Sequence, residues 1–569
     1  MKMKTLTNFI LITIVSAFML PDLTAQHLTR AQLIEDAREM KGIIEACHPD
    51  PYLNTNGKIG FNLAFHEMLN NIPENGMSIE DFWWMLSGFL AKIEDGHTFL
   101  HPVSQPDYSN PGGIPLRFRI LADSNIVIDR VSNPEHLKFI GCRVLNINKL
   151  ETGLLLEQVA KLYPMENYFD HFRNLEVYLW YSSYLKRLFP DWEPGEEVEV
   201  VVENADCTPE KLILQTGSDA LYKTSGTDES LIQLPGTEKC DFVFDWLNDN
   251  KDIGYMCIEK QDEFREYAEQ MIAGLKTIKD PATLKAYRNQ YLEVGHKYYE
   301  RYNGKRGPDS LELLIKGMPS FTEFMKDVVY KLKENNTENL IIDLRNNSGG
   351  VSLMSEILIY FLFGKEKMAE LENNTYSITY LSELNTKTAF SVDIEATNKK
   401  YLEKDMVPLE TGDYDFFPLY EYKDGPAHEL IPASWYEDAG VFYNEYVSGE
   451  HSGFYSPENI YVLGSPDTFS AGFETLVKLL KSGAIFAGVS AAQPANCFGM
   501  AISPVSGLKK SNIRLNVAIR RIVMFPDDPE KGYQLNPDLP LDLVTFRKYN
   551  CDPNASVLIV LDRIEDSAF

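Results

Sequence analysis

The stretch that decides the fold is LIIDLRNNSGG, residues 340–350. It begins with apolar residues that favour a buried strand and ends with two glycines where the chain must turn. The apolar residues at 353–363 then predict a helix. The same order returns in IYVLGSPDTFSAGFETLVKLL, residues 460–480. Two strand, loop, helix units predict a parallel sheet covered by helices, which is an α/β fold.

The composition indicates a globular chain of several domains. Of the 569 residues, 44% are apolar and 24% are charged, so the chain can bury a large core, and its length favours two or three domains. Its 83 acidic and 54 basic residues give a net charge of −29. Nucleic-acid phosphates and anionic lipids would be repelled, and we expect no nucleic-acid partner.

Residues 1–25 have the order of a secretory signal peptide. Lys2 and Lys4 precede an apolar stretch at 9–20, and Leu-Thr-Ala stands before Gln26. This stretch is too short for a comfortable membrane span, and no later segment has a transmembrane pattern. We expect export to the periplasm or secretion after cleavage, with no stable membrane span. An uncleaved anchor is the alternative.

Apolar periodicity divides the rest of the chain. Residues 26–105 have helical spacing, and residues 106–235 are closer to the period of two of a β-rich module. Residues 236–569 form the expected core. We place in it a helical insertion at about 264–316 and a long irregular insertion at about 365–456.

Ser470 and the glycine pair are the first candidates for chemistry. Ser470 begins a helix, where the helix dipole would stabilise a developing oxyanion. Serine is also a preferred N-cap, so the local pattern alone favours a cap. Gly349 and Gly350 would let backbone N–H groups approach a ligand closely, with a plain tight turn as the alternative.

His97 is a candidate general base. It lies in KIEDGHTFLH, residues 92–101, where Asp95 and Gly96 break the preceding helix. His97 and His101 have helical spacing, but no HExxH pattern accompanies them. The seven cysteines are dispersed without a CxxC pair. We therefore expect no metal site and no cofactor.

These motifs, in this order, resemble the C-terminal processing (tail-specific) serine peptidase family. Residues 340–350 are similar to its strand and glycine loop, and residues 460–480 to its nucleophile strand and helix. FGMAISPVSG at 498–507 and NPDLPLD at 536–542 are similar to later segments, and FIGCRVLNINKL at 139–150 resembles the core of its PDZ-like module. The resemblance implies a ClpP/crotonase-type core beside a PDZ-like module.

The residue that would activate the serine separates two branches of this family. In the processing-peptidase branch it is a lysine after the nucleophile helix, but Ala495 and Asn496 stand there, and Lys478 and Lys481 lie on the helix itself. The chain is more similar to the tricorn-like and interphotoreceptor retinoid-binding-protein-like branch. That branch uses a histidine, a serine beside it and a C-terminal glutamate, and Gly96 stands here in place of the serine.

The resemblance implies a mechanism for an exported endopeptidase that acts on peptides or unfolded proteins. His97 would take the proton of Ser470, which would attack a peptide carbonyl. Backbone N–H groups of Ala471 and of Gly349 or Gly350 would hold the oxyanion.

The acid that would orient His97 is the least defined part of this hypothesis. Glu530 is the candidate, and Gln534 is the competing position. An amide there would not stabilise an imidazolium by charge.

Two other functions stay open. One is a catalytically weak or inactive peptide- or ligand-binding protein on the same scaffold, which the missing lysine motivates. The other is a carbohydrate-active enzyme, which would need two facing carboxylates, and no such pair stands out in this acidic sequence. The oligomeric state is also open, with a homo-oligomer as one option.

Overall fold

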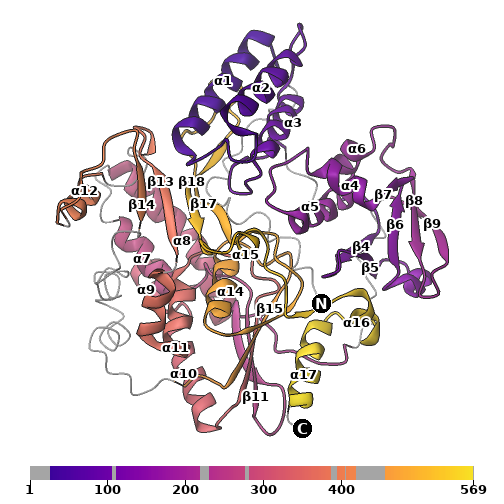
Figure 1. Ribbon diagram of the computed structural model, residues 1–569, viewed down its shortest axis with the longest axis vertical. Coiled ribbons are helices and arrows are strands. Elements are labelled where there is room, and N and C mark those ends of the chain that lie inside the picture. The colour runs from indigo at the N-terminus through magenta and orange to yellow at the C-terminus, as the bar shows by residue number, and fades with distance from the viewer. Residues whose placement is uncertain are drawn as a thin grey trace.

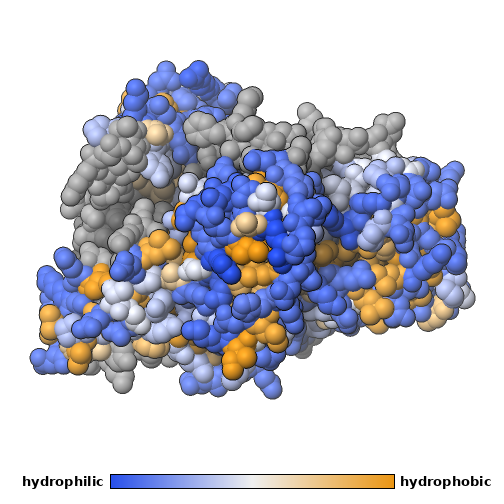
Figure 2. Space-filling model, turned by 90° about the horizontal axis from the view of Figure 1, so that it is seen from above, coloured by the Kyte–Doolittle hydropathy of each residue, from blue (hydrophilic) through white to orange (hydrophobic). Residues whose placement is uncertain are grey.

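The computed structural model describes residues 26–104, 111–217, 230–275, 281–373, 375–385, 394–403, 405–417 and 455–567. The expected signal peptide at 1–25 lies outside them. Among the described helices, none combines the length and apolar character that crossing a membrane requires. The surface seen in Figure 2 is largely hydrophilic with scattered apolar residues, as the composition suggests.

A six-stranded sheet forms the centre of the molecule (Figure 1). The strand order is β10-β11-β12-β15-β16-β19, and only β10 at one edge runs antiparallel to its neighbour. The strands are β10 (Phe242–Trp246), β11 (Ile253–Ile258), β12 (Asn339–Asp343), β15 (Asn459–Gly464), β16 (Ile485–Gly488) and β19 (Leu539–Pro540). The prediction of a parallel sheet from two strand, loop, helix units is confirmed.

Helices cover both faces of this sheet, which explains why β12 is buried at every residue. Leu340 and Ile342 face one side, against α10 (Phe321–Glu334), α11 (Leu353–Asn373) and α14 (Ala471–Lys481). Ile341 faces the other side, against α17 (Ala555–Ser567). Side chains alternate along a strand, so a fully apolar strand requires a layer on each side.

The N-terminal region is helical and holds His97 against the core. Its helices are α1 (Arg30–Cys47), α2 (Gly57–Asn70) and α3 (Ile79–Leu90), with short strands β1 (His27–Leu28) and β2 (Met77–Ser78). A capping box of Thr29 and Gln32 begins α1. After α3 the chain turns through His97 into β3 (Phe99–Leu100), which pairs with β18 (Leu515–Val523).

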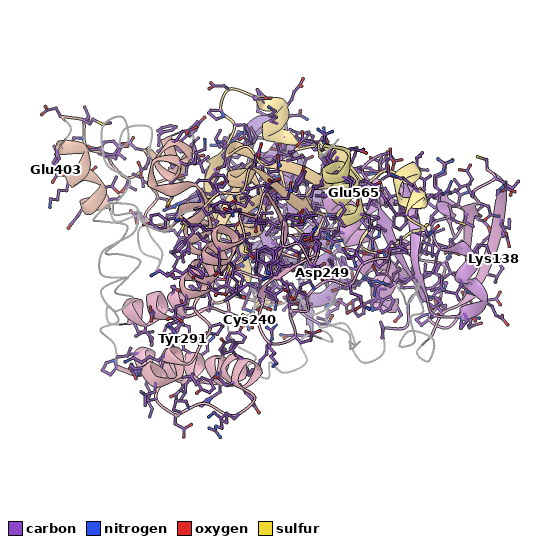
Figure 3. All side chains as sticks on the ribbon, turned by 90° about the horizontal axis from the view of Figure 1, so that it is seen from below. Lys138, Cys240, Asp249, Tyr291, Glu403 and Glu565 are labelled. Carbon is purple, nitrogen blue, oxygen red and sulfur yellow. The ribbon has the colours of Figure 1, made fainter. Side chains whose placement is uncertain are left out.

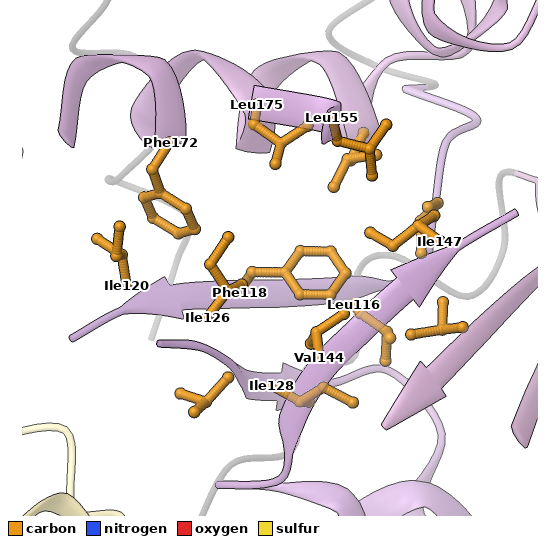
Figure 4. Close-up of a cluster of buried hydrophobic side chains, with 14 of the residues drawn as sticks. Leu116, Phe118, Ile120, Ile126, Ile128, Val144, Ile147, Leu155, Phe172 and Leu175 are labelled. Atoms are coloured by element: carbon orange, nitrogen blue, oxygen red, sulfur yellow. The ribbon is translucent and has the colours of Figure 1, made fainter. Parts of the chain in front are cut away.

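A separate antiparallel sheet with three helices occupies residues 116–215. It contains β4 (Leu116–Ile120), β5 (Ile126–Val131), β6 (Arg143–Ile147), β7 (Leu150–Glu151), β8 (Glu197–Glu203), β9 (Pro209–Gln215), α4 (Thr152–Val159), α5 (Tyr168–Trp180) and α6 (Ser182–Leu188). Figure 4 shows Leu155 of α4 and Phe172 of α5 over the apolar face of the strands. This packing fixes the start of α5, which becomes part of the site.

The two expected insertions have different structures. Helices α7 (Arg265–Leu275), α8 (Pro281–Asn303) and α9 (Leu311–Lys316) occupy the first. The second was expected to be irregular, but it contains β13 (Tyr376–Tyr380), α12 (Ile394–Glu403) and β14 (Tyr414–Phe417), and residues 418–454 lie outside the described residues.

The strands of the second insertion complete another sheet. β13 pairs with β14 and with β18, which also pairs with β17 (Asn496–Ile502). The partner strand β18 lies far along the chain, and only one of the five residues of β13 is fully buried, so its sequence shows no apolar alternation. The remaining helices are α15 (Pro529–Tyr533) and α16 (Leu543–Lys548).

Candidate active site

Ser470 stands at the turn between β15 and α14 in a strained conformation. Its φ of 52° and ψ of −126° lie outside the regions that side-chain-bearing residues usually adopt. Its side chain makes no capping hydrogen bond, so the local interpretation as a cap is wrong. The backbone N–H of Ser470 donates to Oε1 of Gln493 at 2.6 Å. This bond holds the strained backbone and leaves the hydroxyl available for other partners.

The glycine loop lies directly against Ser470, because β12 and β15 are neighbouring parallel strands and their carboxyl ends meet at one edge. A Cβ added at Gly349 would lie 2.7 Å from the Cβ of Ser470 and 2.9 Å from the nitrogen of Ala471. Gly349 also has a φ of 98°, which favours glycine. Both steric contact and backbone conformation therefore require glycine beside the serine.

An internal ion pair fixes the start of this loop. The guanidinium of Arg345 donates to the carboxylate of Asp343 at 2.6 Å, and the hydroxyl of Tyr255 donates to the same carboxylate at 2.6 Å. Burial opposes the ionised Asp343, but Arg345 outweighs it and the pKa of this carboxyl is lowered. Asp343 and Arg345 thus shape the loop by hydrogen bonds.

His97 lies against the residue that precedes the serine. Its ring stacks on Phe469 with the centroids 5.2 Å apart and the planes 17° apart. Its Nδ1 is 3.0 Å from Oε1 of Glu166, and its backbone N–H donates to Asp95 at 2.8 Å. The structure therefore brings His97 to the turn that carries Ser470.

Glu166 is a buried acid whose position is set by the start of α5. Asn167 caps that helix, and the backbone N–H of Glu166 donates to Asp170 at 3.1 Å. His97 and Glu166 are only 8% and 7% exposed, so water screens their interaction little. The second oxygen of Glu166 has no hydrogen-bond partner among the described residues.

The pKa values of both partners are raised, for different reasons. Burial disfavours the carboxylate and raises the pKa of Glu166 to about 7, although His97 acts in the opposite direction. For His97, burial lowers the pKa, but the hydrogen bond and charge of Glu166 outweigh it and the pKa is raised. The pair therefore takes up protons near neutral pH.

Gly96 makes room for Glu166. A Cβ at Gly96 would lie 3.1 Å from Oε1 of Glu166 and 3.3 Å from the ring of Phe469. The sequence suggested that Gly96 leaves His97 without a supporting serine. In the structure, the absence of a side chain lets a carboxylate approach His97 instead.

The other candidate acids and bases lie elsewhere. Glu530 is exposed on α15, and Gln534 donates to Asn536. On α14, Lys478 pairs with Glu474 at 2.7 Å, and Lys481 donates to Thr375.

Gln493 is the residue that the segment after α14 supplies to Ser470. Its Nε2 donates to Sγ of Cys497 at 3.0 Å, while its Oε1 accepts from the serine N–H. An amide cannot act as a general base. Neither Gln493 nor Glu166 stands in a motif, and only the Asn167 cap signal near Glu166 was visible in the sequence.

Comparisons with known proteins concern the family and the fold of the chain. Residues 313–486 match the family model described as peptidase family S41. The chain therefore carries a domain of this family of peptidases, which includes the glycine loop and Ser470. A search among curated proteins found no match.

Two solved structures share the fold over almost the whole chain. Mature CPAF complexed with lactacystin has a TM-score of 0.52 and 12% identity, with 94% of this chain and 98% of that chain covered. Mature CPAF has a TM-score of 0.51 and 11% identity, with 93% and 96% covered. At such low identities the likeness concerns the fold.

Proposed function

We propose that the protein is a serine endopeptidase in which Ser470 is the nucleophile, His97 the general base and Glu166 the acid that orients it. The observation that carries this proposal is the position of His97, between the buried carboxylate of Glu166 and the ring of Phe469. A histidine held by a carboxylate and stacked on the residue that precedes a strained serine supplies the base and the acid that nucleophilic acyl transfer needs.

The tautomer of His97 follows from its contacts. With Nδ1–H donating to Glu166, the other ring nitrogen, Nε2, carries the lone pair that can accept the serine proton. When this proton arrives, the negative charge of Glu166 stabilises the imidazolium. The same proton is then delivered to the leaving amine.

The oxyanion site has two uncommitted donors. The N–H of Gly349 donates to Oδ1 of Asn347 at 2.9 Å. Among the hydrogen bonds of the described residues, none uses the N–H of Gly350 or Ala471. We therefore assign the oxyanion to these two N–H groups, at the positive end of α14, with Gly349 shaping the loop.

Glu166 replaces Glu530 as the proposed orienting acid. A buried carboxylate 3.0 Å from the ring nitrogen acts on the imidazolium in a low-dielectric surrounding, whereas an exposed one is screened by water. The substrates in this proposal are peptides or unfolded proteins. The signal-like order of residues 1–25 supports export.

A fluorophosphonate probe and an unfolded protein substrate test the proposal. The wild-type chain should be labelled and should cleave the substrate, Ser470→Ala should do neither, and His97→Ala should lose both by at least about a hundredfold. Absence of labelling and of cleavage across several unfolded proteins would contradict the proposal and favour a binding protein on the same scaffold.

A further inference from the structure

Three carboxyl groups meet behind the glycine loop, outside the site described above. One oxygen from each of Asp241, Asp262 and Glu263 lies within 4.8 Å of the others. The side chains of Asp241 and Glu263 are 4% and 9% exposed. Figure 3 shows Cys240, the neighbour of Asp241, on the same side of the molecule as the insertion helix that carries Tyr291.

Two cations already reach this cluster. Arg301 of α8 donates to Asp241 and to Glu263, each at 2.7 Å, and Nζ of Lys260 is 3.7 Å from Glu263. Oδ2 of Asp241 and Oδ1 of Asp262 remain buried without a hydrogen-bond partner among the described residues. Three carboxylates therefore face two positive charges and have oxygens without donors.

One proton balances this cluster. It makes the net charge zero and supplies a donor between oxygens that otherwise repel each other. A divalent cation would leave an excess positive charge beside the guanidinium of Arg301. The neighbouring titratable groups do not change this charge balance, because they are uncharged. The pKa values of Tyr267 and Tyr298 are raised, and burial raises the pKa of the Cys240 thiol.

The cluster is joined to the oxyanion loop by the short segment 259–264. Gln261, next to Asp262, donates its N–H to the carbonyl of Gly349 at 3.0 Å and accepts the N–H of Val351 at 2.8 Å. Its side chain donates to Thr475 of α14 at 2.7 Å. Displacement of Asp262 or Glu263 therefore acts on both backbone bonds that fix Gly349 and Gly350.

We propose that Asp241, Asp262 and Glu263 share one proton and that its release, by driving the carboxylates apart, loosens the oxyanion loop and reduces hydrolysis in alkaline solution. The catalytic part of this inference rests on the proposed function, whereas the shared proton does not. Burial and the neighbouring carboxylates raise the pKa of Glu263 to about 8, which places the transition in an accessible range.

The test compares the wild-type chain with Glu263→Gln and with the control Glu312→Gln. Glu312 lies on α9, in the helical insertion that also carries Arg301. Arg288 lowers the pKa of Glu312 to about 2, so the charge of Glu312 is constant above neutral pH. Hydrolysis by the wild type and the control should fall about tenfold between pH 7 and pH 9, because the protonated fraction falls from about nine-tenths to about one-tenth. Glu263→Gln should keep its activity.

Thermal unfolding tests the proton without relying on catalysis. The raised pKa means that the folded chain binds the proton more tightly than the unfolded chain, so stability is lost as the pH rises through about 8. In a Ser470→Ala background the melting temperature should fall by roughly 1–2 °C from pH 7 to pH 9. With Glu263→Gln added, this fall should disappear.

The outcomes separate the two proposals. A chain that hydrolyses nothing but shows the melting shift refutes only the proposed function. An alkaline loss that persists in Glu263→Gln, or a melting temperature that calcium raises and a chelator lowers, overturns the shared proton. If Glu263→Gln does not fold, Asp262→Asn serves instead, because two carboxylates then face two cations and the alkaline loss should again vanish.

Discussion

Replacing Glu166 by glutamine tests the proposed mechanism most directly. The substitution keeps the size of the side chain and removes its charge. Unit charges 3.0 Å apart interact by about 5.5 kcal/mol at an effective dielectric constant of about 20. This energy corresponds to a factor of about 10⁴ in the stability of the imidazolium that forms during attack.

Asp95 limits the loss of activity that we expect in Glu166→Gln. Its Oδ1 is 3.9 Å from Nδ1 of His97 and continues to attract the imidazolium. We therefore expect kcat for peptide hydrolysis to fall between about 10²-fold and about 10⁴-fold in Glu166→Gln. The acid limb of the pH profile should also move to lower pH, because burial lowers the pKa of His97 and the Glu166 carboxylate, which opposes this effect most strongly, is then gone.

The assay is hydrolysis of an unfolded protein together with the rate of fluorophosphonate labelling, both measured from pH 5 to pH 9. Glu530→Gln is the matched control, because it removes an exposed carboxylate in the same conservative way and should leave both rates unchanged. Activity in Glu166→Gln within threefold of the wild type, or a large loss in Glu530→Gln, would refute the reasoning.

Further expectations concern the pH dependence and the surroundings of the serine. Wild-type hydrolysis should decline as the pH falls below about 7, since Glu166 and its histidine partner take up protons there; a flat profile between pH 5 and 8 would contradict this. Gly96→Ser should lower kcat by about tenfold or more by pushing Glu166 from the ring nitrogen, and near-normal rates would show that the close contact is harmless. Gly349→Ala should abolish labelling and destabilise the chain by about 1–3 kcal/mol in chemical denaturation, because the new Cβ meets Ser470. Gln493→Ala should slow labelling with little change in KM, since the strained serine backbone loses its partner, and an effect on KM alone would point to substrate contact.

The parts of the molecule that could be predicted from sequence are those specified locally. The apolar strand before Asp343, the glycine loop and the helix after Ser470 each leave a pattern within about ten residues. The parallel pairing of β12 and β15 follows from these patterns. Two strand, loop, helix units can bury their apolar strands only in a parallel sheet that helices cover on both faces.

The features that could not be predicted from the sequence depend on contacts between residues that are distant along the chain. Glu166 is 69 residues from His97, and nothing in its own surroundings distinguishes it from the many other acids of the chain. The pairing of β13 with β18 is also long-range, and β13 has only one fully buried residue among its five, so its sequence shows no apolar alternation. Glu530 was favoured by its place ahead of the resembling segment at 536–542, and such a place carries no information on burial.

The stack of His97 on Phe469 includes a third region of the chain. The guanidinium of Arg173, on α5, lies over the ring of Phe469, 4.7 Å from its centroid. In the proposed mechanism each region supplies one component: the core gives the serine, the N-terminal helical region gives the base, and the segment before α5 gives the acid. On this proposal, a newly synthesised chain carries no activated nucleophile until all three regions have docked. In the proposed peptidase, complete folding is therefore itself the safeguard against premature cleavage.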